Sequence, residues 1–198
     1  QTASVVALKN GMTLAKELDL VREIRKFSDI PLIGMGYINN MYHYGFEKFV
    51  EDFKAAGMDG VIIPDVPHEE SGDLRRIAAA HDFVLAEFIT PGTTAVRMEE
   101  ICQDASGFIY CVSNNGVTGV KKVDYSTIGA VCDTARSYTR TPLAVGFGIG
   151  SPESAVAAAA HADAVIVGSA VVKELLAGKL DEAAQLIADI REALDKSY

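Results

Sequence analysis

Residues 143–159 read LAVGFGIGSPESAVAAA, which is a short apolar run, a glycine-rich turn and a segment rich in small apolar residues. Ser151 and Pro152 are typical of a helix start, because a serine side chain caps free backbone N–H groups and proline fits the first helical turn. The order of strand, turn and helix is the repeating unit of an α/β fold. The segment therefore predicts one β-strand followed by one α-helix.

The same unit recurs along the chain in both directions from this segment. Short continuous apolar runs predict strands that are covered on both faces, and apolar residues at positions i, i+3, i+4 and i+7 predict helices packed on a sheet. The predicted strands are 31–38, 60–64, 83–89, 107–112, 143–146 and 164–167, and the predicted helices are 12–27, 42–56, 69–80, 94–103, 125–137, 152–160, 169–176 and 180–195.

This alternation predicts an α/β protein with a (β/α)8 TIM barrel. Such a barrel needs eight strands over roughly 250 residues, so a chain of 198 residues with six predicted strands lacks roughly two βα units. The helix predicted at 12–27 has no strand before it, which places the gap at the N-terminus. We expect residues 1–198 to form a single barrel domain, from strand 3 to strand 8. A doubly wound open sheet is the alternative, because it uses the same alternation.

Composition narrows the class of protein. The formal net charge of −9 argues against a nucleic-acid partner, which requires clustered Lys and Arg. No apolar run approaches about 18 residues and Gln1 opens no signal peptide, so we expect a cytoplasmic protein without membrane contact. The three cysteines lie in apolar stretches and are predicted to be buried thiols. The four histidines, which we expect to be solvated, have no metal-site spacing, so no metal is expected.

Two glycine turns predict a phosphate site. Gly146–Gly150 and Gly168–Ala170 each follow a predicted strand and lead into a helix, whose first N–H groups are unpaired and attract anions. Ser169 adds a hydroxyl group. Either turn alone would be an ordinary tight connection, but two in adjacent units, late in a barrel, are where phosphate is often held. The polar loop 113–119 is interpreted as a lid or as a passive surface loop.

Three further residues lie at or near the ends of predicted strands, where barrel enzymes have their catalytic and binding residues. Asp65 is interpreted either as a carboxylate at the rim of the site or as a helix cap or loop anchor. Tyr37 and Tyr110 are interpreted either as pocket residues, with a ring and a hydroxyl group, or as core residues.

Four motifs in order give the chain a specific resemblance: PDVPHEES at 64–71, GVTG at 116–119, GFGI at 146–149 and GSA at 168–170. Together they resemble the tryptophan synthase alpha chain family. The resemblance implies a lyase of tryptophan biosynthesis that cleaves indole-3-glycerol phosphate to indole and glyceraldehyde 3-phosphate. It implies no cofactor in this chain, and it implies a beta chain as partner, which carries PLP and forms an alpha2-beta2 heterotetramer.

The resemblance also implies roles for individual residues, with Thr118 on a mobile lid. Carried over by position, the phosphate-binding residues are Gly119, Gly148, Gly168 and Ser169; the substrate-binding residues are Tyr37, Ile62, Tyr110, Thr118 and Phe147; and the residues near the beta chain are Asn39 and Pro67.

The chain departs from the family at two points. The reaction needs a base for the glycerol hydroxyl group and an acid for the indole ring carbon, and the family's Glu and Asp belong to units upstream of Gln1. We therefore assign no catalytic residue, and we do not give Asp65 a catalytic role. Asn114 stands where an Arg is common in the lid, which leaves the contacts of lid closure undefined.

Three functions remain open from the sequence. The first is an alpha subunit whose N-terminal part is not in this sequence. The second is a truncated, non-catalytic barrel fragment that binds phosphate or a partner. The third is another phosphate-binding barrel enzyme of tryptophan or histidine synthesis, which would not be expected to carry the 64–71 motif.

Overall fold

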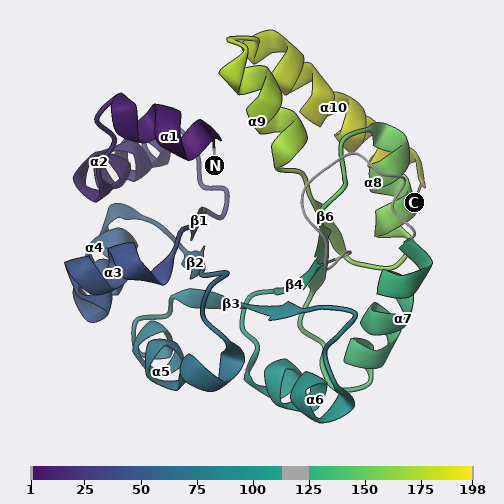
Figure 1. Cartoon of the computed structure of the whole chain (residues 1–198). Helices are drawn as coiled ribbons and strands as arrows, with labels where there is room; N and C mark the ends of the chain where they lie inside the picture. The colour runs from purple at the N-terminus through teal and green to yellow at the C-terminus, as the bar shows by residue number, and fades with distance from the viewer. Residues whose placement is uncertain (1, 113–124, 198) are drawn as a thin grey trace. The chain divides into compact units, whose positions relative to one another are not determined.

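The computed structural model of the chain describes residues 2–112 and 125–197 (Figure 1). The chain divides into two units, Gln1–Glu87 and Phe88–Tyr198, which we call unit 1 and unit 2. Each unit is built from short parallel strands and the helices that follow them, and each has its own apolar core.

Unit 1 pairs its strands in chain order. Strands β1 and β2 are parallel with Ile33 opposite Gly60, and β2 is parallel to the start of β3 with Gly60 opposite Val84. Gly60 is required there, because a Cβ atom on it would lie 2.5 Å from the Val84 Cβ. The elements are α1 (Thr2–Lys9), α2 (Leu14–Arg25), β1 (Ile33–Met35), α3 (Ile38–Tyr44), α4 (Phe46–Ala56), β2 (Gly60–Ile62), the 3-10 helix η1 (His68–Glu70), α5 (Gly72–Ala80) and β3 (Val84–Ile89), whose last two residues belong to unit 2.

Unit 2 repeats the pattern. Strands β4, β5 and β6 are parallel neighbours in chain order, with Ile109 opposite Leu143 and Ala144 opposite Ala164. The elements after β3 are α6 (Ala95–Asp104), β4 (Ile109–Val112), α7 (Tyr125–Arg136), β5 (Leu143–Gly146), α8 (Pro152–Ala159), β6 (Ala164–Ile166), α9 (Ser169–Leu176) and α10 (Leu180–Ser197). Among the described residues, no helix has the length and apolar character needed to cross a membrane.

All six predicted strands are confirmed. In each unit the strands neighbour one another in chain order, as in a barrel, whereas a doubly wound sheet reverses its order at a switch point. The parallel βα architecture is therefore confirmed. The full eight-stranded barrel, with about two units before residue 1, stays a prediction.

Two predicted elements of unit 1 have wrong bounds, and one helix was missed. The helix predicted at 42–56 is two helices, because Gly45 adopts a φ of +89° between α3 and α4. The strand predicted at 31–38 ends at Met35, and Ile38 already begins α3. Helix α1 was not predicted, and its apolar residues do not form a stripe that buries against a neighbour.

The predicted apolar stripes form the cores. Phe49 and Phe53 of α4 are buried in unit 1, with ring centroids 4.3 Å apart. Ile128 and Cys132 of α7 are fully buried in unit 2. All three cysteines are buried free thiols, as predicted.

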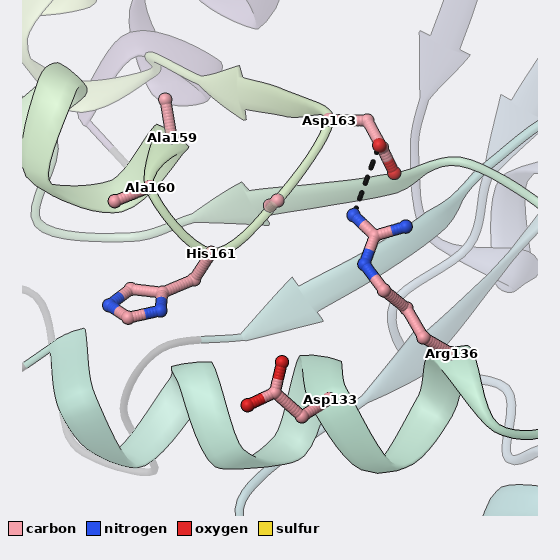
Figure 2. Close-up of a pocket in the computed structure, with 7 residues that line it drawn as sticks. Asp133, Arg136, Ala159, Ala160, His161 and Asp163 are labelled. Atoms are coloured by element: carbon pink, nitrogen blue, oxygen red, sulfur yellow. Dashed lines mark ion pairs between the residues drawn. The ribbon is translucent and has the colours of Figure 1, made fainter.

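A carboxylate ties neighbouring strands together at their amino ends in unit 2. The Asp163 carboxylate, just before β6, accepts the Leu143 N–H at the start of β5 at 2.8 Å, and the Asp163 N–H donates to the Leu143 carbonyl at 2.9 Å. Arg136, at the end of α7, reaches the other carboxylate oxygen at 3.0 Å (Figure 2). We call this three-residue arrangement a carboxylate clamp.

Unit 1 contains a second carboxylate clamp of the same design. Asp59, just before β2, accepts the Leu32 N–H before β1 at 2.7 Å and returns its own N–H to the Leu32 carbonyl at 2.8 Å. Arg25, at the end of α2, lies 2.6 Å from the Asp59 carboxylate. In both clamps one side chain joins a helix end to the starts of two adjacent strands, which fixes the strand register.

We predict that Asp163→Ala lowers the free energy of unfolding by about 1–2 kcal/mol. The substitution removes the charge-assisted bonds that the carboxylate makes with Leu143 and Arg136, and water screens this carboxylate only in part. Urea denaturation measures the change. Asp133→Ala is the matched control, since Asp133 is an exposed carboxylate in the same pocket. Equal losses in the two variants would contradict the clamp.

The Asp163 clamp also predicts a pH dependence. Partial burial raises the pKa of Asp163, but hydrogen bonds from Leu143 and Arg136 outweigh it and hold the pKa below its ordinary value. The unfolded carboxyl group titrates near about 4. The stability difference between the native protein and Asp163→Ala should therefore be complete above pH ~4 and disappear as the pH falls through the lower, folded-state pKa. A difference that grew on acidification would count against the ionised clamp.

Candidate functional site

Three aromatic rings form a row in unit 2, with Phe88 in β3, Tyr110 in β4 and Phe147 just after β5. The Tyr110 ring stacks on Phe88 of β3 with a centroid distance of 5.2 Å, and it meets Phe147, just after β5, edge-on at 6.0 Å. Tyr110 is 6% exposed, whereas Phe147 is 39% exposed. We call Phe88, Tyr110 and Phe147 the aromatic row. It offers an open ring surface beside a buried one.

Gly146 leaves the space that the Tyr110 ring occupies in this row. A Cβ atom on Gly146 would lie 2.1 Å from the Tyr110 hydroxyl oxygen, so the ring crosses the strand where only glycine leaves room. Burial raises the pKa of Tyr110. The hydroxyl group therefore stays neutral near pH 7 and is suited to a hydrogen bond rather than to proton abstraction.

The two predicted glycine turns lie next to each other. After β5, Phe147 and Gly148 both adopt left-handed backbone, with φ of +73° and +76°. The chain then passes Gly150, where an added Cβ atom would lie 3.5 Å from the Ala170 Cβ in the first turn of α9. The two turns are therefore neighbours in unit 2, and their role in binding phosphate stays a prediction.

The start of α9 has features of an anion-binding site. Gly168 precedes the helix without a side-chain cap, and no acidic residue lies in the first turn. Among the described residues, a Cβ atom on Gly168 would meet nothing within 4 Å, and Ser169 is exposed. Free helix N–H groups at the positive end of the helix dipole bind phosphate well. The geometry therefore suits phosphate at this point.

A hydrogen-bonded brace holds the turn after β5. The Ser154 hydroxyl group accepts the N–H groups of Gly150 at 3.1 Å and Ser151 at 3.0 Å, and Ser151 caps α8 as predicted. The Tyr125 hydroxyl group, at the start of α7, donates to the Gly148 carbonyl at 3.4 Å. Neither Tyr125 nor Ser154 was expected from the sequence, because their spacing from Gly148 follows no periodic pattern.

The predicted residues of unit 1 gather around the ends of β1 and β2. Ile62 is buried at the end of β2, and its carbonyl accepts the Gly36 N–H at 3.2 Å. Tyr37 is 62% exposed just before α3. The Asp65 carboxylate accepts the Ile38 N–H at 3.1 Å and thereby anchors the start of α3, which favours the loop-anchor interpretation.

Asn39 and Pro67, the two residues predicted to lie near a partner, belong to the same unit and are both exposed. Asn39 lies in α3, and Pro67 directly precedes η1. Both are therefore accessible to another protein in unit 1.

His68 is not solvated, contrary to the prediction from the sequence. It is 8% exposed, and its Nδ1 lies 3.1 Å from the carboxylate of Glu87, which is 6% exposed on β3. Arg75 donates to the His68 carbonyl at 2.8 Å and to the Ser71 hydroxyl group at 2.6 Å. A glutamate inside an apolar strand was the signal for this buried cluster. Its bonds hold the loop that presents Pro67.

Three of the predicted positions cannot be placed in this site. Thr118, Gly119 and Asn114 lie outside the described residues. A cavity of about 430 Å³ lies between α7, the end of α8 and the turn before β6, beside the Asp163 clamp and at the opposite end of β6 from the start of α9 (Figure 2). Within the part of the chain that the structure describes, no cluster of His, Cys, Asp and Glu could hold a metal ion.

Comparisons with known proteins agree with one another. The family model for the tryptophan synthase alpha chain matches residues 1–197. The tryptophan synthase alpha chain of Desulfatibacillum aliphaticivorans is 44% identical over 86% of this chain and 64% of its own length. That of Caldanaerobacter subterraneus subsp. tengcongensis is 37% identical over 98% of this chain and 76% of its own length. The chain thus spans about two thirds to three quarters of these relatives.

Solved structures give the same result. A protein from Aquifex aeolicus VF5 has a TM-score of 0.88 at 34% identity, covering 96% of this chain and 72% of that one. The tryptophan synthase alpha chain from Legionella pneumophila subsp. pneumophila has a TM-score of 0.82 at 33% identity, with the same coverage. With a family model that matches almost the whole sequence, the chain belongs to the tryptophan synthase alpha chain family.

Proposed function

We propose that the protein takes part in tryptophan biosynthesis as the alpha subunit of tryptophan synthase, a lyase that cleaves indole-3-glycerol phosphate to indole and glyceraldehyde 3-phosphate. The observation that carries the proposal is the position of the two glycine turns beside the aromatic row in unit 2. A substrate with a flat aromatic ring at one end and a phosphate at the other requires both features.

The proposed roles follow the chemistry of the residues. Backbone N–H groups near Gly148, Gly168 and Ser169 bind the phosphate, and the Ser169 hydroxyl group adds a donor. Tyr110 and Phe147 border the indole ring. The family resemblance adds Tyr37 and Ile62 to the pocket and Thr118 and Gly119 to the lid and phosphate site.

The proposed reaction needs a base and an acid, which we do not assign to residues of this chain. The base removes a proton from the glycerol hydroxyl group, and the acid protonates the indole ring carbon as the C–C bond breaks. Both are expected from βα units that precede residue 1 in a complete (β/α)8 barrel. The described residues contribute binding and orientation. The proposal involves no cofactor in this chain.

The proposed partner is a tryptophan synthase beta chain, which would carry PLP, in an alpha2-beta2 assembly in the cytoplasm. A tryptophan synthase complex from Pyrococcus furiosus contains a chain similar to this one, with a TM-score of 0.83 at 28% identity. Asn39 and Pro67, exposed in unit 1, are the proposed contact residues.

We predict that the protein binds indole-3-glycerol phosphate, which calorimetry measures. We also predict that a longer chain, which includes the acid and the base, releases indole from this substrate, which a coupled absorbance assay measures. The 198-residue chain is the control for the catalytic step. Binding without release in the longer chain would favour the non-catalytic alternative. Failure to bind would contradict the proposal, and turnover of another phosphorylated substrate would favour a different barrel enzyme.

We predict that Ser169→Asp weakens binding of glycerol 3-phosphate by more than about tenfold, because a carboxylate at the start of α9 repels the phosphate from its site. The fold should be retained, since an acidic residue near a helix N-terminus is favourable. Thr13→Asp adds the same charge at the N-cap of α2 and should leave affinity unchanged. Calorimetry measures both affinities, and an unaffected Ser169→Asp variant would remove α9 from the proposed site.

A further inference from the structure

We propose that Glu87 is a positioning residue for the partner surface of unit 1, because it fixes the tautomer of His68 and, through His68, the loop that presents Pro67. The inference rests on the proposed function and deepens it, since it links affinity for a beta chain to a buried carboxylate that lies outside the four sequence motifs.

Buried polar side chains of unit 1 form one cluster. Glu87, His68 and Ser71 are all buried, and Glu87 interrupts the apolar sequence of β3. Burying a carboxylate is costly unless charges and hydrogen bonds compensate it. The contacts of this cluster therefore decide how Glu87 is satisfied.

The hydrogen bonds of Arg75 determine the tautomer of the His68 ring. The His68 Nδ1 lies 3.0 Å from the Arg75 Nη1 and 3.1 Å from the Glu87 Oε1, so it can either accept from the first or donate to the second. Arg75 Nη1 has two hydrogen atoms, and its shorter contacts are the His68 carbonyl at 2.8 Å and the Ser71 hydroxyl group at 2.6 Å. These two acceptors use both hydrogen atoms. The His68 Nδ1 therefore carries a proton and donates it to Glu87.

The same cluster fixes the loop that presents Pro67. The His68 carbonyl also accepts the Ser71 hydroxyl group at 2.8 Å and the Ser71 N–H at 3.1 Å. Pro67 directly precedes His68, and its ring holds its φ at −62°, so the position of Pro67 follows that of His68. An exposed residue of the partner surface is thus held by buried residues.

The second proposed contact residue is joined to the same loop. The Asp65 carboxylate accepts the Ile38 N–H at 3.1 Å, and Ile38 precedes Asn39 in α3. Without the Glu87 carboxylate, we expect the His68 Nδ1 to accept from Arg75 instead, which takes Arg75 away from the His68 carbonyl. The loop is then released, and both contact residues lose their position.

The test compares two substitutions of Glu87. Glu87→Leu removes the acceptor and should weaken binding of a tryptophan synthase beta chain by about tenfold or more, because it leaves a buried donor unpaired. Glu87→Gln keeps an oxygen acceptor and should stay within about threefold of the native affinity. Glu51→Leu removes an exposed carboxylate from α4 of the same unit and should leave the affinity unchanged. Calorimetry measures the affinities, and thermal denaturation verifies that each variant is folded.

Nitrogen NMR of the His68 ring gives a signature that a general loss of stability would not produce. We expect the proton on Nδ1 in the native protein and in Glu87→Gln, and on Nε2 in Glu87→Leu. Amide hydrogen exchange tests the loop without a partner. The N–H groups of Glu70 and Ser71, which donate to the carbonyls of Pro67 and His68, should exchange faster only in Glu87→Leu.

Two substitutions of His68 decide the matter if Glu87→Leu does not fold. His68→Asn places an amide N–H near the position of Nδ1 and should keep the affinity, whereas His68→Gln places it near the position of Nε2 and should not. A native His68 proton on Nε2, or native affinity in Glu87→Leu, would overturn the role of Glu87. A native protein that does not bind a beta chain would instead refute the proposed partner, and the ring and amide measurements would still decide whether Glu87 holds the loop.

Discussion

The register of parallel strands depends on the carboxylate clamps at their amino ends. In each unit an aspartate that precedes one strand bonds to the backbone at the start of its neighbour, and an arginine from a helix end pairs with the same carboxylate. A slip of one residue would exchange the two faces of a strand. The clamps therefore determine which side chains reach the core and which remain available at the carboxyl ends.

The candidate site follows from that register. Ile109 and Cys111 enter the unit 2 core, so Tyr110 must point to the other face, where Gly146 of the neighbouring strand leaves space for its ring. The strand that supplies this glycine continues into the left-handed turn at Phe147 and Gly148, which lies beside the start of α9. Aromatic and anion-binding surfaces are thus adjacent because one strand register places both.

The sequence predicted the parts of the molecule that local pattern controls. Six apolar runs became strands, and the Ser151-Pro152 start of α8 is capped as expected. The break at Gly45 was missed because the apolar spacing that begins at Phe46 masks it. The two glycine turns could be recognised because each motif lies within one segment, and their role in binding phosphate stays a prediction. Contacts between distant segments, such as His68 with Glu87 and Phe88 with Tyr110, leave no periodic signal.

The most direct test of the central claim is a crystal structure of the protein with bound indole-3-glycerol phosphate. We predict phosphate density within hydrogen-bonding distance of the backbone N–H groups of Gly148 and Ser169, and the indole ring against Tyr110 and Phe147. A ligand bound elsewhere, or a phosphate at the turns with the ring directed away from the aromatic row, would contradict the account.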